Sequence, residues 1–459
     1  MKKILIIMLM IVLVSILVLV GCAKPAPSPT QTSTPSPSPT TPLAGPTEIV
    51  IGATNSLTGN LSGFGQGMAF GHQSAVEDIN KQGGIFIKEY NRKLPVRLVM
   101  LDDQSDPIKA GTLVESLILQ DKVNFLLIGG GNPPGYAAAA IAAQKYKTPA
   151  VGDDGPYESN RAMWEPVGGW KYSWTTGFHI AVPASPGDWW YNKPGYTIMD
   201  MAATLINQFG VQTNKKTAIF ASDEPDGRAW YNSFPNALKE MGLEVVGYDK
   251  ELGIAPPNTQ DFTATIKQWK DNNCELMFGN ALAPWFGNLW RQSQELGFKP
   301  KLVYAGRAAL FYTDINAWGG DLPLGIGCEQ LWSPSYDPKV CPGIGGTTPQ
   351  SYYERWTAAK NQPLNQGIGF AYANSQVLFD AIERAGTLDK EKVNEALAKT
   401  DMLTIVNRVV FDKDHFAQIP ICWGQWFKTD KAYKWEWQTV LSRHDFIAET
   451  AKPLFPIPY

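Results

Sequence analysis

Two successive series of alternating strand and helix patterns constrain the fold of this chain more than any other feature. Short apolar runs bounded by turn residues predict the strands, and segments with apolar residues at helical spacing separate them. The strands expected in the first series are 48–54, 96–101, 124–129 and 149–152, and those in the second are 216–222, 243–248, 274–278 and 301–305. Parallel strands need helical crossovers, so each series predicts a parallel sheet with helices on both faces.

The helix boundaries carry recognisable signals. Gly83 and Gly84 end the first helix, and Asp106 followed by Pro107 begins the second, since aspartate caps a helix and proline favours its first turn. An aromatic stretch at 156–194 has no clear periodicity and is expected to be irregular. Together these patterns predict an α/β fold of two doubly wound lobes.

The length of the chain supports two lobes. Residues 47–459 are too many for one ordinary hydrophobic core. Ligands of open parallel sheets bind at the carboxyl ends of the strands, so two such sheets facing each other form a cleft. With 16 Trp and 17 Tyr, more than a core needs, several aromatic side chains are expected to line a cleft or an interface.

The N-terminus resembles a lipoprotein export signal. Residues 1–21 have a basic start and an apolar run, and Gly21-Cys22 fits signal cleavage with lipidation of Cys22. A membrane-spanning helix is the alternative interpretation of the apolar run. Residues 22–46, rich in Pro, Ser and Thr, are expected to form an extended tether. The protein is therefore predicted to lie outside the cytoplasm, held to a membrane by the lipid on Cys22.

Composition and cysteine usage exclude several classes of protein. The formal net charge of −3 provides no basic surface for nucleic acid. Cys328 and Cys341 bracket a Pro/Gly-rich stretch and are predicted to form a disulfide, whereas Cys274 and Cys422 are expected to be buried thiols. No cysteine spacing predicts a metal site, and no cofactor is expected. A hydrolase is the competing class, but HExxH, GxSxG and P-loop motifs are absent.

Several segments, in their order along the chain, resemble the type I periplasmic binding proteins of the branched-chain amino-acid group. They include IVIGATNSLTGNLSGFGQGMAFGHQSAVEDINKQGGI, FLLIGGGNPPGYAAAAIAAQKYKTPAVGDDG and GFAYANSQVLFDAIERAG. The resemblance implies a monomer in which the chain crosses three times between two lobes, which close on a small molecule and present it to the permease of an ABC importer. Lobe I would comprise 47–175 and 328–412, and lobe II 176–327 and 413–459.

Residues carried over from the family depart from its amino-acid site. The family binds an α-carboxylate with hydroxyl groups and backbone N–H groups on two loops of lobe I. Here the first loop contains Asn132 and Tyr136 without the expected serine, and the second contains Asp153 and Asp154, which repel a carboxylate.

In lobe II the alignment places Arg307 where the family has an acidic residue that accepts from the ligand ammonium, and an arginine cannot accept. The loop that ends at Asp226 matches a loop that contains a tyrosine in the family, but here the loop is acidic. Trp285 follows a second loop, which lacks the tyrosine usual in the family. Phe64 matches the position of an aromatic residue that covers the ligand. The ligand is therefore predicted to be a small polar or aromatic molecule and not a plain branched-chain amino acid.

Alternative roles remain open for these residues. Asp153 and Asp154 could pin their loop through backbone N–H groups, and Arg307 could pair with Asp314 or Asp321. The tryptophans of the 156–194 stretch are expected to pack that stretch against the lobes. At the level of function, a receptor subunit that signals ligand binding to a separate membrane partner is the alternative to transport.

Overall fold

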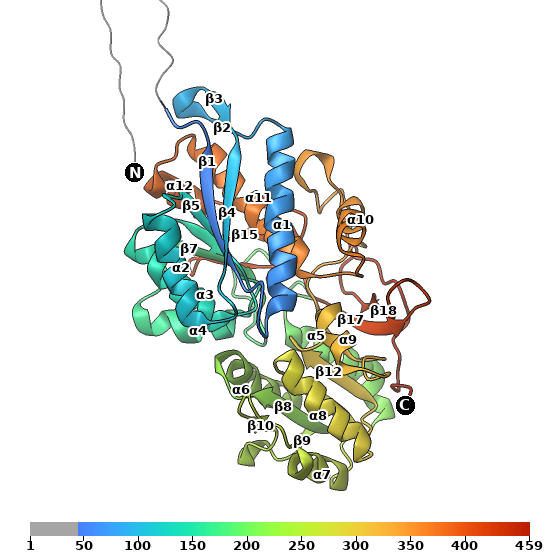
Figure 1. Cartoon of the computed structure of the whole chain (residues 1–459). Helices are drawn as coiled ribbons and strands as arrows, with labels where there is room; N and C mark the ends of the chain where they lie inside the picture. Colours follow the sequence, from blue (N-terminus) through green and yellow to red (C-terminus); the bar gives the residue numbers. More distant parts are fainter. Residues whose placement is uncertain (1–44) are drawn as a thin grey trace, which may run out of the picture. The chain divides into compact units, whose positions relative to one another are not determined.

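The computed structural model describes residues 45–459 (Figure 1). The expected signal peptide, the expected lipidation site Cys22 and nearly all of the expected tether lie outside these residues. Within residues 45–459, no helix is both long enough and apolar enough to cross a membrane.

The first sheet has six strands, all parallel, in the order β16-β7-β6-β5-β1-β4. Its strands are β1 (Ile49–Asn55), β4 (Val96–Asp102), β5 (Phe125–Ile128), β6 (Ala150–Gly152), β7 (Ser173–Gly177) and β16 (Phe416–Gln418). Successive residues of β5 face opposite sides, because Phe125 and Leu127 join one core cluster while Leu126 and Ile128 join another. This alternation explains why the buried strands read as continuous apolar runs.

Helices cover both faces of this sheet. On one face α1 packs against α11, and on the other α2 packs against α3 (Figure 1). The helices of this half are α1 (Ser62–Lys81), α2 (Pro107–Leu119), α3 (Pro133–Lys145), α4 (Tyr157–Trp164), α10 (Pro349–Lys360), α11 (Gly367–Ala385) and α12 (Lys390–Leu397). The predicted start of α2 is confirmed, since the Asp106 side chain accepts from the backbone N–H groups of Ile108 and Lys109.

The second sheet has eight strands and mixes parallel and antiparallel pairs. Its order is β10-β8-β11-β12-β13-β17-β18, with β9 beside β8, and the pairs β13–β17 and β17–β18 are antiparallel while the others are parallel. The strands are β8 (Lys216–Ser222), β9 (Glu244–Val245), β10 (Ile254–Ala255), β11 (Leu276–Asn280), β12 (Leu302–Gly306), β13 (Gly327–Gln330), β17 (Cys422–Lys428) and β18 (Trp435–Leu441).

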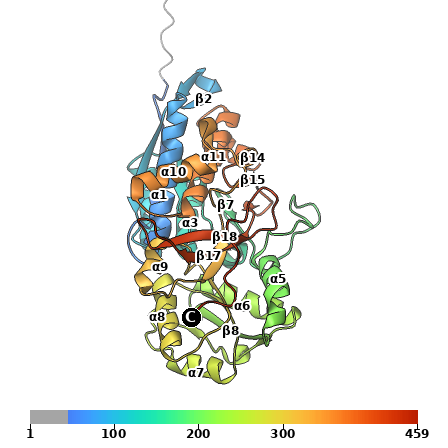
Figure 2. The same ribbon diagram turned by 90° about the vertical axis from the view of Figure 1, so that its right-hand side faces the viewer.

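Helices also flank the second sheet, as Figure 2 shows for α5 and α8 on its two sides. They are α5 (Ile198–Phe209), α6 (Pro225–Glu240), α7 (Thr263–Asp271), α8 (Ala283–Glu295) and α9 (Tyr312–Trp318). Two small antiparallel pairs, β2 (Ile85–Ile87) with β3 (Arg92–Leu94) and β14 (Asp401–Thr404) with β15 (Asn407–Val410), complete the strands. The predicted α/β architecture is confirmed.

Two local expectations are wrong. The stretch 156–194 is not irregular throughout, because it contains α4 and the sheet strand β7, whose polar sequence SWTTG hid its burial. The predicted Cys328–Cys341 disulfide is absent. Within residues 45–459, all four cysteines are free and buried. Cys328 lies inside the second sheet opposite Gly424, whereas Cys341 packs beside the Asn407 side chain, so different packing environments hold the two thiols.

Candidate functional site

A small cavity lies at the carboxyl ends of strands from both sheets, as expected for parallel sheets. We call it the interlobe cavity, and its volume is about 20 Å³, roughly the room that one water molecule needs. Its lining residues are Phe64, Gly131, Pro133, Asp154, Gly155, Pro156, Phe178, Asp226, Trp230, Asn280, Arg307, Leu310, Glu329 and Leu331.

The loops after β5 and β6 supply the wall on the side of the first sheet. Gly131 has φ +78°, and a Cβ there would lie 2.4 Å from the ring of Phe64. At Gly130 a Cβ would lie 2.0 Å from Oδ1 of Asp154. Glycine at both positions therefore lets Phe64 and Asp154 lie directly against this loop.

Arg307, between β12 and α9, connects the two sides of the cavity. Its Nη1 lies 2.7 Å from Oε1 of Glu224 and 3.3 Å from Oδ2 of Asp226, both near the start of α6. Its Nη2 donates to the carbonyl oxygen of Gly131 at 3.1 Å, and its backbone N–H donates to Glu329 at 2.9 Å. The side chain is buried, so these contacts replace its solvation.

Three carboxyl groups line the cavity with Arg307. Asp226 accepts from the hydroxyl of Ser159 at 2.6 Å, and Glu329 accepts from the hydroxyl of Tyr304 at 2.7 Å. Oδ1 of Asp154 has no hydrogen-bond partner within residues 45–459. Burial raises the pKa of all three carboxyls, to about 6 for Asp226 and about 7 for Glu329, and the charge of Asp153 raises the pKa of Asp154 further.

Of the eight residues predicted from the sequence, four line the interlobe cavity, namely Phe64, Asp154, Asp226 and Arg307. Phe64 makes an edge-to-face contact with Phe311, with ring centroids 4.4 Å apart. Arg307 pairs with Glu224 and Asp226, not with Asp314 or Asp321 as the alternative interpretation held.

The other four predicted residues do not line this cavity. Asn132 caps α3 through a bond from the Gly135 N–H at 3.2 Å. Tyr136 donates to the carbonyl oxygen of Trp174 at 3.2 Å. Oδ2 of the buried Asp153 accepts from the amide of Asn160 at 2.6 Å.

Trp285 lies elsewhere in the second half of the chain. Its indole N–H donates to the carbonyl oxygen of Pro256 at 3.1 Å, its ring packs edge-to-face on Phe262, and it lines a separate hollow beside α8. The sequence analysis identified the correct segment here but not the direction of the side chain.

Several lining residues escaped the sequence analysis, among them Trp230, Asn280 and Glu329. Asn280 is the last residue of β11 and Glu329 lies within β13, and both are almost completely buried. A polar residue inside or at the end of a buried strand was the available signal for both, because burial of such a group needs a specific partner. Trp230 on α6 carried no such signal.

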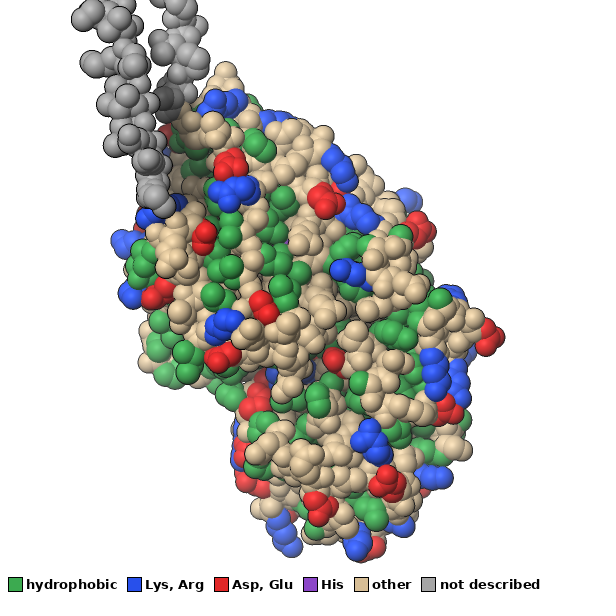
Figure 3. All heavy atoms as spheres, in the orientation of Figure 1, with side chains coloured by type: hydrophobic (Ala, Val, Ile, Leu, Met, Phe, Trp, Pro, Cys, Tyr) green, Lys and Arg blue, Asp and Glu red, His purple; other side chains and the backbone are tan. Residues whose placement is uncertain are grey.

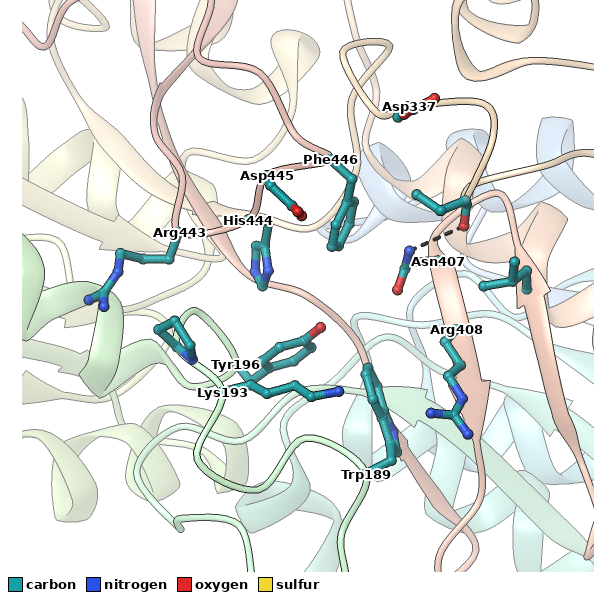
Figure 4. A pocket seen from close by; sticks show the side chains of 13 residues that line it. Trp189, Lys193, Tyr196, Asp337, Asn407, Arg408, Arg443, His444, Asp445 and Phe446 are labelled. Carbon is teal, nitrogen blue, oxygen red and sulfur yellow. Dashed lines mark hydrogen bonds between the residues drawn. The ribbon is translucent and has the colours of Figure 1, made fainter.

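A larger hollow of about 620 Å³ lies away from the interlobe cavity (Figure 4). Its lysine and arginine side chains already have partners within the protein. Arg408 makes two bonds of 2.7 Å with Asp401, Arg443 donates to Thr204, and Lys193 lies 4.9 Å from the ring centroid of Trp189. The interlobe cavity is lined by buried carboxyl and amide oxygens without hydrogen-bond partners in the described part of the chain, those of Asp154 and Asn280, so it is the stronger candidate binding site.

The described part of the chain offers no alternative site centred on a metal. Within residues 45–459, no three His, Cys, Asp or Glu side chains are grouped so as to hold a metal ion. The carboxyl cluster of the interlobe cavity therefore has to be understood through hydrogen bonds and charge.

Comparison with known proteins gives the family. The model of a family described as periplasmic binding protein matches residues 48–431. The chain belongs to this family. An amino acid binding protein of Pseudomonas aeruginosa is 24% identical over 368 residues, covering 80% of this chain and 86% of that protein. Leu/Ile/Val-binding protein homolog 3 of Brucella melitensis is 24% identical over 342 residues, covering 74% of this chain and 80% of that protein.

Solved structures of the same architecture agree. A leucine binding protein from Thermotoga maritima superposes with a TM-score of 0.65 at 20% identity, covering 86% of this chain and 99% of that one. A second structure is a solute binding protein of an ABC transporter from Rhodopseudomonas palustris, solved with 3,4-dihydroxy benzoic acid. It has a TM-score of 0.63 at 18% identity, covering 88% of this chain and 99% of that one. At these identities the structures show the fold.

The chain is thus a type I periplasmic binding protein of the branched-chain amino-acid-binding group, and the relatives and neighbours that it resembles are binding proteins and not enzymes. Membership of this family implies a location outside the cytoplasm.

Proposed function

We propose that this protein, lipid-anchored through Cys22, captures a small polar or aromatic molecule between two closing lobes and delivers it to the permease of an ABC importer. The ligand is not a plain branched-chain amino acid. The protein acts as a monomer, and the lipid on Cys22 holds it to the membrane.

The arrangement of charge in the interlobe cavity carries the proposal about the ligand. An α-amino acid brings one carboxylate and one ammonium group. Asp154 lies against the loop after β5, where a ligand carboxylate would need backbone donors, and would repel it. Arg307 stands on the opposite side, where an ammonium group would need an acceptor. Both ends of an α-amino acid therefore meet a group of like charge.

Contacts across the cavity support closure of the two lobes around a ligand. Ser159 on α4 bonds Asp226 on α6, and Arg307 bonds the carbonyl oxygen of Gly131. Each bond joins an element that flanks the first sheet to one that flanks the second. Bonds of this kind break when lobes separate at a hinge and re-form when they close.

We propose that the lobe boundaries lie a few residues beyond those expected from the sequence. The first sheet uses β7 and β16, and the second uses β13 and β17. The three crossings then follow Gly177, Gln330 and Gln418, the last residues of β7, β13 and β16.

The ligands of structural neighbours are chemically diverse. The Rhodopseudomonas palustris protein was solved with 3,4-dihydroxy benzoic acid, and a substrate binding protein from Streptococcus pneumoniae was solved with isoleucine. The shared fold is therefore compatible with a non-amino-acid ligand. For this chain, Phe64, Asp154, Asp226 and Arg307 are the side chains proposed to contact it.

Thermal unfolding of the protein against a panel of amino acids, aromatic acids, amides, polyols and amines tests this function. A ligand that binds only the folded state adds about 2.7 kcal/mol at 100 times its dissociation constant. We expect a rise of the midpoint with a compound other than leucine, isoleucine or valine. A rise with any of these three would overturn the proposal about the ligand.

Delivery and anchoring need their own measurements. Co-purification with a permease supports transport, whereas co-purification with a membrane kinase would favour the alternative of a receptor subunit for signalling. Cys22→Ala is expected to release the protein from the membrane fraction, and continued membrane association of this variant would contradict the lipid anchor. Sedimentation is expected to give the mass of one chain.

A further inference from the structure

The charges around the interlobe cavity do not balance. Asp154, Asp226 and Glu329 line it, and Arg307 is the one cation among its lining residues. Arg307 already pairs with Glu224 and Asp226 at 2.7 and 3.3 Å. Within residues 45–459, no lysine, arginine or histidine forms a salt bridge with Asp154 or Glu329. In their ionised forms, these two buried carboxyl groups therefore have no countercharge.

Two residues that line this cavity contain unpartnered acceptor atoms. Oδ1 of Asp154 and Oδ1 of Asn280 have no hydrogen-bond donor within residues 45–459, although the two residues are only 3% and 1% exposed. A buried acceptor without a donor destabilises the folded protein, and more so when it is charged. A ligand that donates to both atoms would remove this destabilisation.

From this we infer that the ligand has a net positive charge and carries a primary ammonium or guanidinium group, which donates to Asp154 and Asn280 and neutralises the carboxyls beside Arg307. This inference rests on the proposed function and narrows its ligand class. An organic cation fits better than a metal ion, since no group of residues in the described chain is arranged to hold a metal.

The remaining walls and groups agree with this chemistry. Phe64, Phe178 and Trp230 add aromatic surface, which attracts cations through the ring face. Nε of Arg307 is an unpartnered donor and offers a site for one acceptor atom elsewhere on the ligand. A ligand with a cationic nitrogen at one end and a carbonyl or hydroxyl oxygen at the other would satisfy all three atoms.

Binding of such a cation is coupled to proton release. Burial raises the pKa of Asp154 and Glu329, and a bound cation lowers both again by favouring the ionised forms. The charged and titratable groups facing this pair are Asp153, Asp226 and Arg307, with Glu224 behind Arg307 and the Tyr304 hydroxyl on Glu329. Affinity for the cation is expected to weaken as pH falls from 8 to about 5.

The test is titration calorimetry and thermal unfolding of the full chain with probes that differ in charge. Ethylammonium and agmatine are the cationic probes with N–H donors, and choline is a cation without them. Leucine, inositol and 3,4-dihydroxybenzoate represent zwitterionic, neutral and anionic compounds. We expect a midpoint rise with ethylammonium or agmatine, proton release in buffers of different ionisation enthalpy, and a weaker response to choline.

Substitutions locate the binding site. Asp154→Asn and Asn280→Ala are expected to weaken cation binding at least tenfold. Asp223→Asn is the matched control, because Asp223 pairs with Arg228 on the surface of α6 and does not line the cavity. Glu329→Gln serves if Asp154→Asn fails to fold, and should also reduce the number of protons released.

The outcomes separate this inference from the proposed function. If leucine, inositol or 3,4-dihydroxybenzoate raises the midpoint and the cations do not, the inference is wrong while the protein remains a ligand-binding protein. Cation binding that Asp154→Asn and Glu329→Gln leave unchanged would also overturn it. If no compound of any charge class binds, both the inference and the proposed function fail.

Discussion

Arg307 in the loop after β12 donates from Nη2 to the carbonyl oxygen of Gly131 in the loop after β5, at 3.1 Å. The two residues are far apart in sequence and belong to loops at the ends of different sheets. One guanidinium therefore links the first half of the fold to Glu224 and Asp226 in the second. At the waist between the two halves, basic and acidic side chains come close together on the surface (Figure 3).

Replacing Arg307 with alanine should destabilise the protein by about 3–5 kcal/mol, because removal of one partner leaves buried carboxylates unpaired. Urea unfolding monitored by tryptophan fluorescence measures the loss. Arg228→Ala is the matched control, since Arg228 and its partner Asp223 are both 36% exposed and a surface pair contributes about 0–1 kcal/mol. Equal losses for the two variants would contradict the role given to Arg307.

Ser159→Ala should shift the protein toward an open form. The hydroxyl of Ser159 donates to Asp226 at 2.6 Å across the cavity, and a hydrogen bond to a charged group contributes about 1.5–3 kcal/mol. Small-angle X-ray scattering should give a larger radius of gyration for the variant. Ser293→Ala is the control, because that buried hydroxyl bonds the Leu289 carbonyl within its own helix, and this variant should keep the wild-type radius.

Glu329→Gln should change how stability depends on pH. Burial raises the pKa of Glu329 to about 7 from an ordinary value of 4.5. Between these values the folded state binds more protons than the unfolded state, so this group lowers the free energy of unfolding as pH rises. The variant does not lose stability in this way. Its free energy of unfolding, relative to that of wild type, should therefore rise by about 1–3 kcal/mol between pH 4.5 and 8.

Denaturant unfolding at several pH values checks this prediction. The comparison with wild type cancels contributions from other groups, including the buried His72, whose pKa burial lowers to about 3. Parallel stability curves for the two proteins would show that Glu329 does not titrate in this range.

Reductant should leave the unfolding midpoint unchanged, because Cys274, Cys328, Cys341 and Cys422 are free thiols. Alkylation after denaturation without reductant should modify all four, and mass spectrometry counts the labels. In the native protein labelling should be slow, since the thiols are buried and burial raises the pKa of Cys274, Cys341 and Cys422 to about 12. Two unmodified cysteines before reduction would reveal a disulfide.

Phe64 and Trp285 should respond differently to substitution. Phe64 lines the interlobe cavity, whereas Trp285 lines a separate hollow. For the compound that raises the unfolding midpoint, Phe64→Ala should weaken binding at least tenfold and Trp285→Phe should leave it nearly unchanged. Titration calorimetry on both variants measures the affinity. An equal loss of affinity in the two variants would contradict a ligand site in the interlobe cavity.

The α/β architecture and the helix starts follow from the sequence by itself, because apolar periodicity, caps and turn residues act over a few neighbouring positions. The loops containing Asp154 and Arg307 were indicated by the resemblance to the family and not by these local patterns. The sequence patterns did not reveal that β16 joins the first sheet, since Phe416–Gln418 is too short to show a period and pairs with a strand more than two hundred residues earlier.

Tertiary structure decided which side chains of those loops face the cavity. Asp153 and Arg307 adopt positive φ values of 64° and 61°, which few side chains do without long-range support, and local sequence did not indicate this. Packing turned Asp153 toward Asn160 and Trp285 toward Pro256, while it brought Glu329 beside Arg307. Local patterns specify elements, whereas the directions of buried polar groups depend on partners that only the folded chain brings together.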